Sequence, residues 1–121
     1  MERIVIPDKI HSLNVLNNYH WGKKLKLKKQ YQLLVRNQMR LNQLEKCKVH
    51  DKFSLKIISY RSRLLDQDNL IGGSKLLIDA LCDEGYIWDD CPKYLVTAEY
   101  HQAKIKGMEN KTLIERKPLC K

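Results

Sequence analysis

Seven of the chain's fourteen acidic residues lie in the 25-residue stretch Asp66–Asp90, which holds a single basic residue, Lys75. The stretch has a formal charge of −6, whereas the other 22 basic and seven acidic residues give the remainder a charge of +15. A hard divalent cation such as Mg²⁺ binds clustered carboxylates through their oxygens, and lysine and arginine side chains attract phosphate. These two charge patterns predict a divalent cation held by carboxylates and acting on a phosphate backbone.

The spacing of the aspartates suggests how such a centre forms. Asp66 and Asp68 are separated by one residue, so at the end of a strand both carboxylates would point to the same side. Asp89 and Asp90 follow the next helix, and we expect them to open the next strand and return to the same place. Three carboxylates from two strand ends would then surround one ion that activates water for phosphodiester hydrolysis.

Lys75 is the candidate for stabilising charge on the reacting phosphate. In a continuous helix Asp68, Gly72, Lys75 and Asp79 share one face, with Lys75 roughly 10 Å along the axis from Asp68. Adjacent glycines are unfavourable inside a helix, which leaves a second arrangement open. In that arrangement Ser74 caps a helix that starts there, and Gly72–Gly73 forms a loop that lets a phosphate approach.

Other sites fit the sequence less well. An EF-hand that starts at Asp66 would need an oxygen ligand at Leu70, glycine at Ile71 and glutamate at Leu77, and a P-loop motif is absent. Zinc is not favoured, because no Cys-x-x-Cys pair occurs among the four cysteines, which we expect to be free thiols. A purely structural interpretation remains: Asp68 caps a helix, Lys75 pairs with Asp79, and Asp89–Asp90 forms a solvated turn.

A second candidate surface precedes the acidic stretch. Five lysines occur in the seven residues from Lys23 to Lys29, at the start of a helix that we expect to reach about Gln43. Its apolar stripe is predicted at Leu27, Tyr31, Leu34, Gln38 and Leu41. A ridge of Lys29, Arg36 and Arg40 lies in a narrow angular sector of the same helix. The set predicted to bind nucleic acid is Lys23, Lys24, Lys26, Lys28, Lys29, Arg36 and Arg40; an ordinary solvated face is the alternative.

The remaining elements are predicted from hydrophobic patterning. Strands are expected at residues 2–7, 52–61, 95–105 and 112–116, with the last two pairing through a loop that contains Gly107 and Asn110. A second helix ends near Gly85. The order β-α-β-α-β-β predicts a mixed α/β (α+β) fold with two main helices on a mixed sheet.

The chain length, the net charge and the length of the apolar runs limit the class of protein. A chain of 121 residues predicts a single domain spanning 1–121, and a net charge of +9 indicates a polyanionic partner. No apolar run is long enough to span a membrane and no cleavable signal pattern is present, so we expect a cytoplasmic protein with no membrane partner.

The acidic motif resembles that of the RusA family of Holliday junction resolvases. The matching positions are Asp66-x-Asp68-Asn69, Lys75, Asp79-Ala80-Leu81, Gly85 and Asp89-Asp90. The early strand, the lysine-rich helix and the closing strands extend the likeness over nearly the whole chain. Many members place two residues between the Asn and the Lys; the five found here, including Gly72-Gly73, are associated with the phage-type branch.

The resemblance implies a homodimeric endonuclease that cuts four-way DNA junctions by symmetric nicks in recombination and repair, in a bacterial or phage-infected cell. It implies Mg²⁺, with Mn²⁺ as a substitute, bound by Asp66, Asp68 and Asp90, and an essential Lys75. Asp79 and Asp89 match acidic positions with secondary roles. The alternatives are a non-catalytic nucleic-acid-binding protein with a structural acidic cluster, and a small metal-binding regulator.

Overall fold

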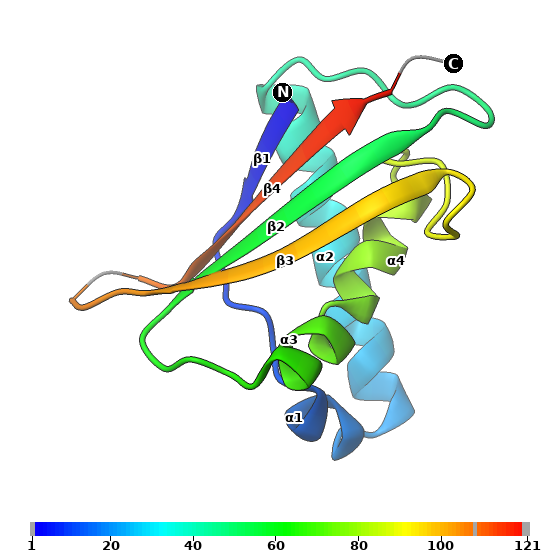
Figure 1. Cartoon of the computed structure of the whole chain (residues 1–121). Coiled ribbons are helices and arrows are strands. Elements are labelled where there is room, and N and C mark those ends of the chain that lie inside the picture. The colour runs from blue at the N-terminus through cyan, green and yellow to red at the C-terminus, as the bar shows by residue number, and fades with distance from the viewer. Residues whose placement is uncertain (1, 108, 120–121) are drawn as a thin grey trace.

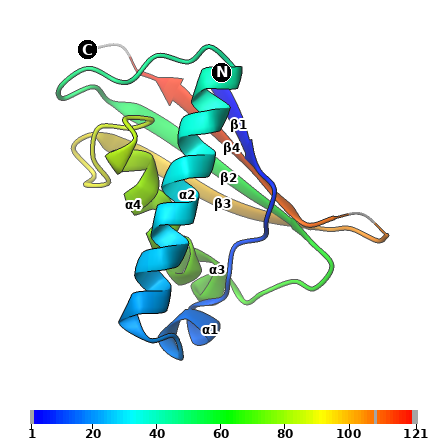
Figure 2. The ribbon, with the colours of Figure 1, turned by 180° about the vertical axis from the view of Figure 1, so that it is seen from behind.

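The computed structural model describes residues 2–107 and 109–119. Within them the chain forms one four-stranded mixed sheet with its helices on one side (Figures 1 and 2). The mixed α/β class predicted from the sequence is confirmed. In chain order the elements are β1 (Glu2–Ile6), α1 (Leu13–Asn17), α2 (Trp21–Leu41), β2 (Phe53–Arg61), α3 (Gln67–Gly73), α4 (Lys75–Asp83), β3 (Leu95–Lys104) and β4 (Lys111–Pro118).

The strands lie in the order β1-β4-β2-β3, with β2 and β3 parallel and the other two pairs antiparallel. The predicted pairing of the last two strands is therefore wrong, because β2 lies between them. Two parallel strands need a crossover, which α3 and α4 supply across one face of the sheet. β4 is the more buried of the last two strands, since Ile114 faces Ile57 of β2 on one side and Ile4 of β1 on the other.

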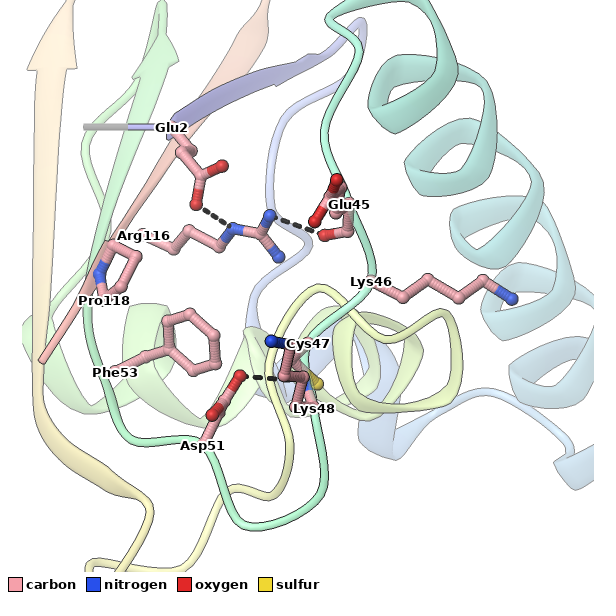
Figure 3. Close-up of a pocket in the computed structure, with 9 residues that line it drawn as sticks. All are labelled: Glu2, Glu45, Lys46, Cys47, Lys48, Asp51, Phe53, Arg116 and Pro118. Atoms are coloured by element: carbon pink, nitrogen blue, oxygen red, sulfur yellow. Dashed lines mark hydrogen bonds and ion pairs between the residues drawn. The ribbon is translucent and has the colours of Figure 1, made fainter. Parts of the chain in front are cut away.

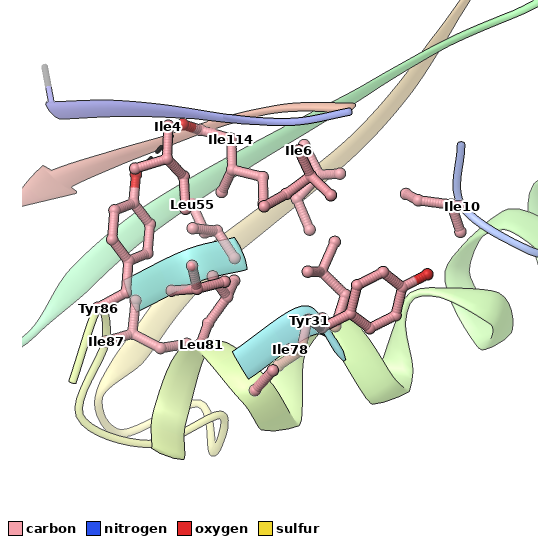
Figure 4. Packing of buried hydrophobic residues seen from close by; sticks show 14 of the residues in the cluster. Ile4, Ile6, Ile10, Tyr31, Leu55, Ile78, Leu81, Tyr86, Ile87 and Ile114 are labelled. Atoms are coloured by element: carbon pink, nitrogen blue, oxygen red, sulfur yellow. Dashed lines mark hydrogen bonds between the residues drawn. The ribbon is translucent and has the colours of Figure 1, made fainter. Parts of the chain in front are cut away.

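The core lies between the sheet and the helices. Phe53, Leu55 and Ile57 alternate along β2 and are all at most 3% exposed. They belong to one cluster with the buried side chains of α2, α4 and the segment after α4, part of which is drawn in Figure 4. Tyr86 is fully buried there and its hydroxyl donates a hydrogen bond to the carbonyl oxygen of Glu2 at 2.7 Å. Each such side chain contributes about 1.5–3 kcal/mol through burial.

Helix α2 has 21 residues and packs one side against the core. Its buried stripe is Tyr31, Val35 and Met39, at steps of four residues. Leu41, predicted to be in the stripe, is 75% exposed; it follows Met39 by two residues, which turns it about 200° around the axis. None of the helices in residues 2–107 and 109–119 is long and apolar enough to cross a membrane.

One buried arginine joins several segments. Arg116 of β4 is 3% exposed, and its Nε donates to Glu2 Oε1 at 2.8 Å. Its two terminal nitrogens donate to the carbonyl oxygens of Tyr86 and Glu45, each at 2.7 Å. Figure 3 shows this guanidinium beside a hollow, with Phe53 and the 45–51 loop around it. Because each of the three guanidinium nitrogens donates to a different residue, this arrangement holds β1, β4 and two loops together.

Candidate active site

Asp66 and Asp68 lie at the start of α3, so their predicted position at the end of a strand is wrong. β2 ends at Arg61, five residues before Asp66. The Arg61 side chain turns back and donates hydrogen bonds to the carbonyl oxygens of Arg63 at 2.7 Å and Ile10 at 2.6 Å. These bonds fix the bend that follows β2 and redirect the chain into α3.

Neither of these two carboxylates has a structural partner among the described residues. Asp66 occupies the N-cap position of α3 but its side chain makes no capping hydrogen bond, and Asp68 lies in the first turn. Both residues are exposed. The proposed capping by Asp68 is therefore wrong. A negative charge in the first turn of a helix is favourable, yet it leaves all four oxygens available to a ligand.

Lys75 joins the beginning of α4 to the loop after it. Its Nζ lies 3.3 Å from Asp90 Oδ2 and 3.7 Å from Asp79 Oδ1. The hydrogen bond to Asp90, and then the charge of Asp79, raise the pKa of Lys75. The same hydrogen bond from Lys75 lowers the pKa of Asp90, against the opposing effect of burial. The pair is therefore fully ionised at neutral pH.

The charge of Asp90 also acts on two neighbouring groups. Burial, followed by the carboxylates of Asp90 and other acids, raises the pKa of Cys82 to about 12. Burial and then Asp90 raise the pKa of Tyr100 on β3. Cys82 and Tyr100 therefore stay neutral, and Asp90 and Lys75 are the charged groups at this point.

Asp89 and Asp90 form a bend, and the expectation that they open the next strand is wrong. β3 begins at Leu95. The Asp89 carboxylate accepts a hydrogen bond from the backbone amide of Asp90 at 2.7 Å. Asp89 thus shapes the turn that presents Asp90 to Lys75, while Asp79 pairs with the same lysine from one turn along α4.

Gly72 and Gly73 are part of α3 and do not form a phosphate-binding loop. A Cβ atom at Gly73 would lie 1.8 Å from the carbonyl oxygen of His11, and one at Gly72 would lie 2.7 Å from Leu13 Cδ2. The glycines therefore allow the chain entering α1 to approach α3 closely. Between α3 and α4 the Ser74 hydroxyl donates to the carbonyl oxygen of Leu70 at 2.8 Å instead of capping α4.

A hollow of about 420 Å³ opens beside the Lys75–Asp90 pair. Its walls come from α3, α4 and β3, and its lining is mainly apolar, with Ile71, Val96 and Tyr100 among the contributors. Asp68 precedes Ile71 by three residues on α3, so its side chain lies on the same helix face, one turn from the hollow.

Two glutamines that were not among the predicted site residues hold α3 against β3. Gln67 Nε2 donates to the carbonyl oxygen of Tyr100 at 3.2 Å. Gln102 exchanges two hydrogen bonds with the backbone of Leu65, at 2.8 and 2.6 Å. These contacts fix the residues on either side of Asp66. No sequence signal identifies them, because they depend on the position of β3 in the sheet.

The residue types fit Mg²⁺, which prefers a few carboxylate oxygens and keeps several waters. The arrangement of these residues does not form a complete set of metal ligands. Across the described residues, no group of three or more His, Cys, Asp or Glu side chains is placed to hold a metal ion. In this conformation Asp90 is engaged by Lys75, while Asp66 and Asp68 lie at the start of α3.

Six of the seven predicted nucleic-acid-binding residues of α2 fall into two groups. Lys28 lies 3.2 Å from Asp83 Oδ2, and Arg36 binds both carboxylate oxygens of Glu84, at 2.8 and 3.2 Å. These two cations join α2 to the end of α4. The second group is exposed and comprises Lys23, Lys26, Lys29 and Arg40.

Lys24 connects the basic helix with the acidic site. It lines a hollow of about 150 Å³ together with Gly72 and Lys75. Lys23 lies nearby along α2, with its Nζ 4.0 Å from the centre of the Tyr19 ring. Of these two lysines at the start of α2, Lys24 shares a hollow with Lys75, whereas Lys23 lies over Tyr19.

Comparison of the chain with protein-family models, curated proteins and solved structures gave no match.

Proposed function

We propose that this protein is a Mg²⁺-dependent, structure-selective DNA endonuclease of the RusA type, which resolves Holliday junctions by symmetric phosphodiester hydrolysis. The observation that carries the proposal is the Lys75–Asp90 pair, 3.3 Å apart, beside a hollow that Asp68 approaches from one turn away. Asp66 and Asp68 meanwhile have exposed carboxylates with no described structural partner. Exposed carboxylates without a structural partner are candidate ligands for a hard divalent cation.

The residues take distinct roles in this proposal. Asp66, Asp68 and Asp90 would hold the ion, which when bound supplies charge stabilisation and an activated water. Lys75 stays protonated at neutral pH, because Asp90 and Asp79 raise its pKa, and it stabilises negative charge on the reacting phosphate. Asp79 positions the Lys75 ammonium, and Asp89 shapes the turn that carries Asp90.

DNA binding is assigned to the exposed cations of α2. Lys24 shares a hollow with Lys75, so a phosphate backbone that follows the start of α2 leads to the proposed site. Lys28 and Arg36 act mainly within the protein, through Asp83 and Glu84. A two-fold homodimer would present two such sites, which matches two symmetric incisions in a four-way junction.

A non-catalytic nucleic-acid-binding protein is the second candidate. It is favoured by one observation, that the described residues include no ready group of three metal ligands. In that case the contacts of Lys75 with Asp79 and Asp90 would only stabilise α4 and the following loop.

The test is cleavage of a synthetic four-way junction in Mg²⁺, with binding measured separately without divalent ions. Asp68→Asn keeps the size of the side chain but removes its charge, so we expect cleavage to fall by roughly 100-fold or more while binding is kept. Glu109→Gln is the matched control, because Glu109 is an exposed carboxylate in the loop between β3 and β4. It should cut like the wild type.

Two outcomes would change the proposal. A wild type that binds the junction but never cuts it, in Mg²⁺ or in Mn²⁺, would establish the non-catalytic binder. Equal cutting of linear duplex and four-way junction would support nuclease activity but contradict the proposed selectivity for Holliday junctions.

A further inference from the structure

Trp21, the first residue of α2, is 71% exposed. Tryptophan is usually buried over most of its surface, and Trp21 lies outside the hydrophobic core cluster of the described residues. Leu25 is 44% exposed and follows Trp21 by four residues, so the two side chains are neighbours on one face of the helix. We call Trp21 and Leu25 the apolar patch. Packing within the chain does not account for this patch, which is open to another molecule.

The Trp21 ring has one aromatic neighbour. The His20 ring lies beside it, with 5.5 Å between the ring centroids and 38° between the planes. His20 Nδ1 accepts a hydrogen bond from the backbone amide of Gly22 at 3.2 Å, so the imidazole is held by its capping role. A large planar side chain with few rotatable bonds loses little conformational entropy when it binds a flat ligand.

The surroundings of the apolar patch are positively charged. Residues 9–44 contain eight lysines and arginines and no acidic residue. Lys24 follows Trp21 by three residues, so it lies on the same helix face, and it shares a hollow of about 150 Å³ with Lys75. The start of α2 lies at the same end of the molecule as α1 and α3 (Figures 1 and 2). An exposed aromatic ring among cations is the combination that binds single-stranded nucleic acid.

We infer that Trp21 stacks on an unpaired base of the DNA strand that enters the proposed site, while Lys24 contacts the phosphate backbone. In linear duplex both faces of each base are covered by the neighbouring base pairs, so the indole finds a free face only where pairing is interrupted. Trp21 therefore favours branched or single-stranded DNA over linear duplex. The inference rests on the proposed function in taking DNA as the ligand, and its test needs no cleavage.

The fluorescence of Trp21 measures the stacking directly. The chain has two tryptophans, so Trp88→Phe leaves Trp21 as the only one. Without divalent ions we expect oligothymidylate to quench about half or more of its emission, and linear duplex of equal length to quench far less. Trp21→Phe leaves only Trp88, which is half-buried with its ring 5.6 Å from that of His50. Its emission should change little with either probe.

Binding titrations supply the second measurement. Trp21→Ala should weaken the binding of oligothymidylate by roughly 5- to 150-fold, which is the range for loss of one base–aromatic stack. Its affinity for linear duplex should stay within about two-fold of the wild type, because the phosphate contacts remain. Trp21→Phe keeps an aromatic face and should recover most of the lost affinity. Leu33→Ala is the control, since Leu33 is another exposed apolar residue of α2, and it should bind like the wild type.

The outcomes separate this inference from the proposed function. Bound oligothymidylate that leaves the Trp21 emission unchanged, or equal affinity of Trp21→Ala and the wild type, would overturn the inference even in a protein that cuts four-way junctions. Strong quenching in a protein that never cuts DNA would support the stacking and contradict the nuclease. A blue shift of the Trp21 emission with phosphatidylserine vesicles, without quenching by oligothymidylate, would assign the apolar patch to an anionic membrane surface and overturn the inference.

Discussion

Lys75 lies between two carboxylates that reach it from different parts of the chain. Asp79 is one turn along the same helix, whereas Asp90 comes from the bend that follows it. Isolated pairs on a helix surface contribute little, about 0.3–0.5 kcal/mol. The Asp90 contact matters more for chemistry, because it keeps both charges in place beside the hollow.

Replacing Lys75 by methionine should raise the pKa of Asp90 back toward its ordinary value of 3.8, because the hydrogen bond that lowers it is lost. The depressed pKa of Asp90 stabilises the folded protein above pH 3.8, and this stability is lost as the pH falls through the lower pKa that Asp90 has in the folded state. The raised pKa of Lys75 stabilises the folded protein below pH 10.5, and this stability is lost as the pH rises through the higher pKa that Lys75 has in the folded state.

Carboxyl NMR titration without metal measures the pKa of Asp90 in the wild type and in Lys75→Met. An Asp90 pKa that is the same in both proteins would show that the pair does not persist in solution. Lys106→Met is the control.

At the scale of the element, α2 performs two separate tasks. Tyr31, Val35 and Met39 bury one side of it against the core. Lys28 and Arg36 fasten it to the last acids of α4. The exposed cations that remain are available to a phosphate backbone.

Lys29→Ala and Arg40→Ala should each reduce the salt dependence of DNA binding. Each phosphate contact contributes about −0.9 to the slope of log affinity against log salt on duplex arms. A loss of about 0.9 per variant is expected in binding titrations at several salt concentrations. Lys106→Ala, exposed in the loop between β3 and β4, should leave the slope unchanged. A flat salt dependence of the wild type would contradict the role of α2.

The contact between α1 and α3 depends on glycine. Gly73→Ala would bring a Cβ atom to 1.8 Å from a backbone oxygen of His11, which is unable to move aside alone, so we expect roughly 3 kcal/mol of destabilisation or more. Gly72→Ala meets only the Leu13 side chain, at 2.7 Å from Cδ2 and 3.2 Å from Cβ, and should cost less. Urea denaturation compares the two with Gly22→Ala, whose nearest neighbouring atom is an ordinary 3.4 Å away. Equal stability of Gly73→Ala and Gly22→Ala would contradict this packing.

At the scale of the whole molecule, the proposed site draws on segments that lie on either side of one crossover connection. Asp66 and Asp68 enter from β2, whereas Asp90 leads into β3, and these strands are parallel neighbours with α3 and α4 between them. Gln102 and Gln67 secure this crossover to β3. The acidic stretch is therefore positioned by one connection across the sheet.

The helices and strands were predicted from the sequence more accurately than the contacts between them. Alternation along β2 and the four-residue steps of α2 are local signals, so Leu55 and Tyr31 were assigned to the core correctly. Gly107 suggested a hairpin after β3, but strand partners depend on burial of Ile114 between two neighbours, which no local pattern reports. The position of Asp66 was likewise mistaken, because the bend made by Arg61 uses the distant carbonyl of Ile10.

The most direct measurement of the central claim is an anomalous-difference map of crystals soaked in Mn²⁺. We predict one ion in contact with Asp66, Asp68 and Asp90, and no ion at those residues in Asp68→Asn. An ion bound elsewhere, or no ion at these three aspartates in the wild type at saturating Mn²⁺, would contradict a metal-dependent active site in the acidic stretch.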